Sequence, residues 1–183
     1  MPACQYSAYK VMAVNEGIQG FSFEYPQNYA LIRLDLRNDA TYQYTQLGLS
    51  ASEGANYSEI YAYLWYPGQD ASTADVIMDQ LLAGAVTMAD YALVSRTTTM
   101  IGDTIAQQVV FVADGSQPVD TTTDSTEAPS DTIAASSRPA TYRITCMVFG
   151  GVAIEIDMTC DQSLTDITRD DYQHVLDTFQ VVD

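Results

Sequence analysis

The stretch SEIYAYLWY (residues 58–66) is the strongest guide to the fold, because both of its faces are apolar. Successive side chains of a strand point to opposite sides, so Tyr61, Tyr63 and Trp65 line one face. The other face consists of Ile60, Ala62, Leu64 and Tyr66. A strand that is apolar on both faces is typical of the middle of a sheet covered on both sides. Packing is therefore the simpler explanation of the aromatic row. The alternative is a platform on which Tyr61, Tyr63 and Trp65 hold a ligand.

The segments around this stretch alternate with the period of two that is typical of strands. Turn signals such as Asn15-Glu16-Gly17 and Gly102-Asp103 separate them. In addition to 58–66, we expect strands at residues 8–14, 20–25, 31–37, 42–51, 92–100, 104–113, 140–149 and 152–160.

Two stretches change to the helical period of 3.6 residues. Residues 72–90 carry an apolar stripe and open with a capping box of Ser72 and Asp75. Residues 166–180 carry a second stripe, with Thr168 and Asp171 in the capping positions. These patterns predict an α+β fold in which other layers cover both faces of a β-sheet.

The length of 183 residues fits one domain of roughly 150 residues better than two. We expect residues 1–7 to be an N-terminal tether or a remnant added for expression, and residues 8–183 to form a single domain. Residues 114–139 are rich in Thr, Ser and Asp and contain almost no large apolar side chain. Such a segment cannot offset its own ordering entropy, so a mobile surface insertion is expected there.

Charge excludes two classes of partner. The chain has 7 basic and 24 acidic residues, a net charge of −17, and Lys10 is its single lysine. The acidic residues are spread along the sequence, so the folded surface itself should be negative. Such a surface repels the phosphates of nucleic acids and of anionic lipids.

Three cysteines cannot all pair within the chain. Ala3-Cys4 matches the end of a bacterial lipoprotein signal, which makes Cys4 a candidate for lipid attachment. Matching apolar faces across the last hairpin favours a three-residue loop, which would put Ile154 opposite Cys146. Cys160 would then lie too far along the strand for a disulfide, so Cys146 and Cys160 should be buried and reduced.

No strong catalytic or cofactor motif is present. The single histidine, His174, should face water, and no metal ligand set or Gly-rich phosphate loop is found. Asp120, Asp124 and Glu127 lack the spacing of an EF-hand loop and should be solvated. Glu155 and Asp157 share one face of a strand, most simply a solvated outer face. Their alternative is the paired carboxylates of a hydrolase.

Three segments resemble motifs of the PsbP-like family: GFSFEYPQNY (20–29), IGDTIAQQVV (101–110) and YQHVLDTFQV (172–181). The resemblance spans most of residues 8–182. It implies a central antiparallel β-sheet flanked by helices, an α-β-α sandwich. Members of this family include an extrinsic subunit of the photosynthetic oxygen-evolving complex, a Ran-binding import factor and many bacterial secreted or lipid-anchored proteins. The 114–139 insertion and the single lysine depart from the family pattern, so docking on a photosystem is in doubt.

The function expected is that of a non-enzymatic, extracytoplasmic accessory or binding domain, either lipid-anchored at the cell surface through Cys4 or secreted, with no cofactor and no metal. Its partner would be a protein or a small ligand, and it would contact a membrane only through the lipid. Two alternatives stay open. The first is a small-ligand or divalent-cation binding protein that uses the Tyr61, Tyr63 and Trp65 face or the acidic surface. The second is a carboxylate-based hydrolase at Glu155 and Asp157.

Overall fold

The computed structural model describes residues 8–38, 43–53, 56–68, 71–114 and 139–182. Their strands form a seven-stranded sheet in the order β3-β4-β5-β9-β8-β7-β6 and a three-stranded sheet in the order β1-β2-β10. Every pair of neighbouring strands is antiparallel. The strands are β1 (Tyr9–Val14), β2 (Gly20–Pro26), β3 (Ala30–Asn38), β4 (Gln43–Glu53), β5 (Asn56–Trp65), β6 (Ala92–Ile101), β7 (Thr104–Asp114), β8 (Pro139–Phe149), β9 (Val152–Asp161) and β10 (Gln180–Val182).

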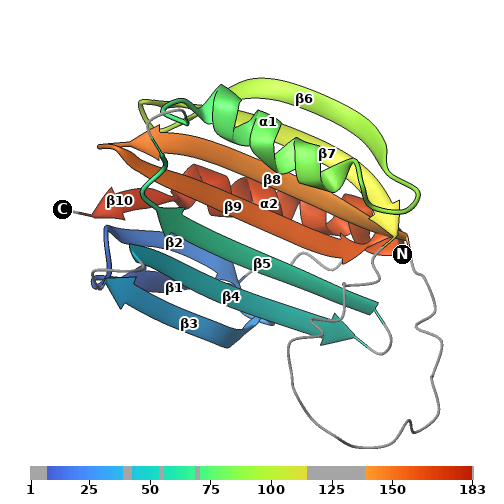
Figure 1. The fold of residues 1–183 in the computed structure, drawn as a ribbon. Coiled ribbons are helices and arrows are strands. Elements are labelled where there is room, and N and C mark those ends of the chain that lie inside the picture. The colour runs from blue at the N-terminus through green and yellow to red at the C-terminus, as the bar shows by residue number, and fades with distance from the viewer. Residues whose placement is uncertain (1–7, 39–42, 54–55, 69–70, 115–138, 183) are drawn as a thin grey trace, which may run out of the picture.

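The two helices lie on opposite faces of the large sheet (Figure 1). Helix α1 (Ala74–Ala85) packs chiefly on β7 and β8. Helix α2 (Thr165–Thr178) lies behind the sheet and packs on β2 and β9. The three-stranded sheet shares that side with α2. The fold is therefore mostly antiparallel sheet with two helices, richer in strands than the helix-flanked sandwich expected from the sequence. Neither helix is long and apolar enough to span a membrane.

The central position of residues 58–66 is confirmed. Strand β5 is third in the large sheet, and Ile60, Ala62 and Leu64 are fully buried against the α2 side. On the other face the aromatic residues of β5 are only partly buried. The cover is incomplete there because α1 packs over the β7–β8 half of the sheet. The strand is thus closed on one face and partly open on the other.

The helix starts differ from the predicted capping boxes. Thr73, rather than Ser72, caps α1 by accepting a hydrogen bond from the Val76 amide at 3.4 Å. A short 3₁₀ turn at Gln162–Leu164 leads into α2, so this helix begins before Thr168. The Thr168 hydroxyl instead donates to the Leu164 carbonyl at 3.0 Å. Strand β10 was not predicted, because its residues continue the apolar pattern of the helix before it.

The predicted register of the last hairpin is wrong. Gly150 and Gly151, with φ of +57° and +85°, form a two-residue turn that pairs Phe149 with Val152. Cys146 therefore lies opposite Glu155 and not opposite Ile154. Apolar matching failed as a guide because β9 is covered on both faces, so neither of its faces needs to be matched to solvent. The glycines decided the register, since this turn needs positive φ at both central positions.

Both described cysteines are buried and free, as predicted. They lie on opposite faces of the sheet. The Cys146 thiol donates to the Ala74 carbonyl of α1 at 3.1 Å, whereas the Cys160 thiol lies 3.2 Å from the Thr168 hydroxyl of α2.

The expected 114–139 insertion and the expected tether at residues 1–7 lie outside the described residues, apart from the two ends of the insertion. Asp114 and Pro139 pair with each other at the adjoining ends of β7 and β8.

Tyr172 anchors α2 to the sheet and provides a test of this packing. Its buried hydroxyl donates to the Ile156 carbonyl at 2.6 Å and lies 2.7 Å from Thr145 Oγ1. We expect Tyr172→Phe to lower the free energy of unfolding by about 1–3 kcal/mol, because both partners stay buried without it. Thermal melts should show a loss of about 2–4 °C per kcal/mol. The exposed Tyr66→Phe is the control, and equal melting temperatures for the two variants would contradict this role.

Candidate binding pocket

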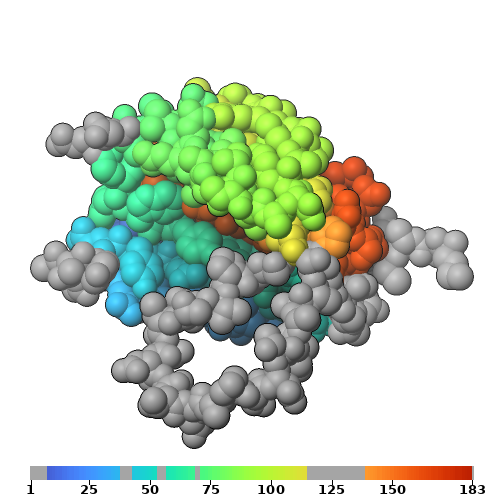
Figure 2. All heavy atoms as spheres, turned by 45° about the vertical axis from the view of Figure 1, so that its right-hand side comes forward, coloured from blue at the N-terminus to red at the C-terminus, as the bar shows by residue number. Residues whose placement is uncertain are grey.

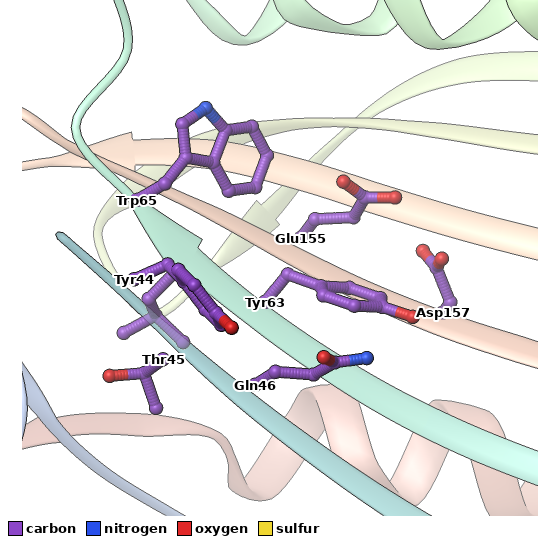
Figure 3. A pocket seen from close by; sticks show the side chains of 8 residues that line it. Tyr44, Thr45, Gln46, Tyr63, Trp65, Glu155 and Asp157 are labelled. Carbon is purple, nitrogen blue, oxygen red and sulfur yellow. The ribbon is translucent and has the colours of Figure 1, made fainter. Parts of the chain in front are cut away.

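A pocket of about 510 Å³ lies over β4, β5 and β9. It occupies the part of the large sheet beside α1 (Figure 3). In Figure 2 the atoms of α1 and β6 form the upper part of the molecule, and those of β4 and β5 reach the surface below them. The pocket is lined by Tyr44, Thr45, Gln46, Tyr63, Leu64, Trp65, Glu155 and Asp157.

Strand register explains why these side chains meet. Tyr63 of β5 lies opposite Gln46 of β4 on one side and opposite Glu155 of β9 on the other. Side chains at paired positions share one face of a sheet. Three adjacent strands therefore place an aromatic, an amide and a carboxyl group side by side.

Two of the three residues predicted as a ligand face, Tyr63 and Trp65, line the pocket. The third, Tyr61, stacks on Tyr63 with ring centroids 5.7 Å apart. Its ring lies over Gly48, where an added Cβ would stand 2.7 Å from Tyr61 Cε1. Gly48 thus leaves the space that Tyr61 occupies, and Tyr61 supports the pocket from beside it.

Glu155 and Asp157 lie two positions apart on one face of the central strand β9, close enough for each to shift the pKa of the other. Glu155 is 8% exposed, and Asp157 is partly buried. Asp157 Oδ1 is shielded from solvent and has no hydrogen-bond partner within the described ranges. The expectation of a solvated outer face is therefore wrong. In Figure 3 the two carboxyls lie side by side, and Tyr63 extends toward Asp157.

The environment of the pair favours its protonated form. Burial raises the pKa of Glu155. Burial, followed by the adjacent Glu155, raises the pKa of Asp157 well above its ordinary value. Two neighbouring carboxyls do not both ionise easily, because their negative charges repel each other. No arginine or lysine is among the groups that shift either pKa.

The other nucleophilic and basic candidates do not join this pair. Burial, and then Glu155, raises the pKa of Cys146 to about 12, which makes its thiol a poor nucleophile. His174 lies on α2, on the other side of the large sheet. The prediction that His174 faces water is wrong. Its Nε2 lies 2.8 Å from Glu24 Oε2 and its ring stacks on Tyr9 at 3.7 Å, which leaves the side chain 30% exposed.

The remaining candidate residues, Cys4, Asp120, Asp124 and Glu127, lie outside the described residues. Among the described ranges, no three His, Cys, Asp or Glu side chains gather as metal ligands. The pocket offers two carboxyls, one amide and aromatic hydroxyls, a donor set too small to enclose a calcium ion with the protein alone.

Tyr44 and Gln46 were not predicted as site residues. The burial of Tyr44 and Gln46 does not mark them as site residues, but their positions in the strand do. Both lie on the strand that pairs with β5, at the alternate positions that share a face with Tyr63. Tyr44 also has the Arg37 guanidinium 5.7 Å from its ring centroid.

No family model matches the sequence, and no curated protein matches it. Solved structures do share its fold. A Pseudomonas aeruginosa protein of unknown function, PA94, is 11% identical, with a TM-score of 0.58 over 94% of this chain and 96% of that one. The Saccharomyces cerevisiae Ran-binding protein Mog1p is 10% identical, with a TM-score of 0.58 over 96% of each chain. CyanoP, the PsbP of the cyanobacterium Synechocystis, is 10% identical, with a TM-score of 0.55 over 100% of this chain and 98% of that one. The resemblance to the PsbP-like family is supported at the level of fold.

The carboxyl pair generates a test by pH. Folding raises the pKa of Asp157 above 3.8, so between that value and the folded pKa the unfolded chain loses a proton that the folded protein keeps. The free energy of unfolding therefore falls as pH rises through this window. Asp157→Asn removes the effect, and we expect its melting temperature to exceed that of the wild type increasingly from pH 4 to pH 8.

Each kcal/mol gained should raise the melting temperature by about 2–4 °C in a chain of this size. The matched control is Glu16→Gln, whose side chain is exposed. A difference between Asp157→Asn and the wild type that stays constant over this pH range would refute the shifted pKa.

Proposed function

We propose that the chain is a binding domain and that the pocket over β4, β5 and β9 is its ligand site. The observation that carries this proposal is the meeting of Tyr63, Trp65 and the Glu155–Asp157 pair in one pocket. Pockets with apolar, aromatic walls and a few convergent polar groups are typical of small-ligand sites. A buried carboxyl pair without a basic partner costs stability, and such costs concentrate at functional sites.

The domain would work as a non-enzymatic accessory protein outside the cytoplasm, tethered by a lipid on Cys4. Ala3-Cys4 and the acidic surface with a single lysine support this proposal. The PsbP-like fold supports only the binding part of this proposal, since Mog1p, which shares the fold, is a Ran-binding protein. The ligand would be a small molecule or a side chain of a protein partner that enters the pocket.

A carboxylate-based hydrolase is the second candidate, because the acid pair lies in a pocket and the pKa of each carboxyl is raised. Proton-sharing carboxyls are the chemistry of aspartic proteases. Turnover of a peptide substrate that Asp157→Asn abolishes would favour this candidate over a binding domain.

Trp65 makes the pocket directly measurable, because it is the only tryptophan of the chain. We expect a panel of amino acids, amines, sugars, short fatty acids and divalent ions to contain compounds that change its fluorescence saturably. Gln46→Ala and Tyr63→Ala should weaken that binding about tenfold or more, because each removes part of the pocket wall. Tyr9→Phe, on the other side of the sheet, should leave it unchanged. A panel without any saturable change would contradict a small-ligand site.

The tether is tested separately. Mass spectrometry of the protein extracted from the membranes of its source should find diacylglycerol on Cys4. A mature N-terminus without lipid would disprove the anchor and leave the pocket proposal untouched.

A further inference from the structure

We propose that the ligand of this pocket carries an organic cation, a substituted ammonium or guanidinium group, held at the Glu155–Asp157 pair and flanked by Tyr63 and Trp65. This inference rests on the proposed binding function and specifies the chemistry of the ligand. It follows from an unpaired acceptor, from the aromatic walls and from the charge of the molecule.

The acid pair lacks a hydrogen-bond donor. Asp157 Oδ1 is shielded from solvent and accepts no hydrogen bond from the described residues. Burying such an acceptor without a donor costs about 1–3 kcal/mol in proteins, so a donor brought by a ligand would recover that cost. A positively charged N–H donor would suit the site best, because its charge also stabilises the ionised carboxyl.

The described basic residues nearest the acid pair make their contacts elsewhere. Arg96 reaches α1 and pairs with Asp75 and Asp79. Arg143 lies on the α2 side of the sheet, where its Nη2 donates to the Thr165 carbonyl at 2.8 Å and its Nη1 has no hydrogen-bond partner among the described residues. No described arginine or lysine therefore neutralises the pair from within.

The aromatic walls of the pocket also suit a cation. The faces of tyrosine and tryptophan rings carry negative potential and attract cations within about 6 Å. One ring of this pocket already does so, since the Arg37 guanidinium lies 5.7 Å from the Tyr44 centroid. Tyr63 and Trp65 lie on the same face as the carboxyls (Figure 3), so a cation that reaches the acid pair meets ring surface as well.

The electrostatic field of the whole molecule also favours a cation. A net charge of −17 concentrates cations at its surface and repels anions. An inorganic ion is a poorer fit, because two carboxyls supply few of the six to eight oxygens that calcium takes. An apolar flank against the rings favours an organic cation over a hydrated metal.

The experiment is a titration of the full chain with organic cations, followed by Trp65 fluorescence. The probes are tetramethylammonium, butylammonium and butylguanidinium, with 1-pentanol and neopentyl alcohol as neutral analogues and Ca²⁺ as the inorganic cation. We expect saturable changes with the organic cations, at affinities at least about tenfold above those of the neutral analogues. Asp157→Asn and Glu155→Gln should each weaken cation binding by about 10- to 100-fold.

Matched controls separate the local pair from the overall charge. Asp170→Asn and Glu16→Gln remove the same charge at exposed positions and should leave the affinities within about twofold. An equal loss in the controls and the pocket variants would overturn the proposal, because the attraction would then be unspecific. Circular dichroism of every variant confirms that the fold is retained.

Two further arms identify the source of the cation and separate this inference from the function it rests on. A capped Gly-Arg-Gly peptide that binds better than butylguanidinium points to a partner side chain, and the reverse order points to a free small molecule; either supports the cation. If the neutral analogues or Ca²⁺ bind as well as the organic cations, the proposal of an organic cation is overturned. The pocket then stays a ligand site. Failure of every probe here and in the wider panel overturns both.

Discussion

Strand β9 pairs with β5 on one side and with β8 on the other, and it is the middle strand of the seven. Its Ile154, Ile156 and Met158 pack into the main core together with residues of β5. The alternate positions of the same strand must then face the α1 side, where Ala153 is buried under the helix and Glu155 and Asp157 lie beyond it. The burial of the carboxyls thus follows from the core packing of their neighbours.

Much of this fold could be predicted from residue patterns. All nine expected strands and both helices exist, and the two-sided strand at 58–66 lies near the centre of the sheet. Element boundaries were less accurate, because a 3₁₀ turn precedes α2 and a short strand follows it. The register of the last hairpin depended on two glycines with positive φ rather than on the match of apolar faces.

The site was predictable in part for a different reason. An aromatic row on a central strand has the same sequence pattern whether it packs under a helix or lines a pocket. Only the position of α1 distinguishes these two arrangements. Likewise, alternating carboxyls in a strand indicate a solvent-facing side in most sheets. Here the tertiary arrangement buries them, and the sequence contains no local sign of it. Tyr44 and Gln46 became site residues only through their pairing with β5. The fold itself does not decide the function, since unrelated functions use one fold.

The pairing of Asp114 with Pro139 has a consequence for how such a domain can vary. The chain leaves the sheet at the end of β7 and returns to it at the adjoining end of β8, so the ladder itself fixes the distance between the two ends. In loops generally, each doubling of length adds only about 0.6 kcal/mol to the free-energy cost of bringing the ends together. The domain can therefore gain or lose residues between these two positions while the sheet, and the pocket on β9 beside β8, keep their geometry.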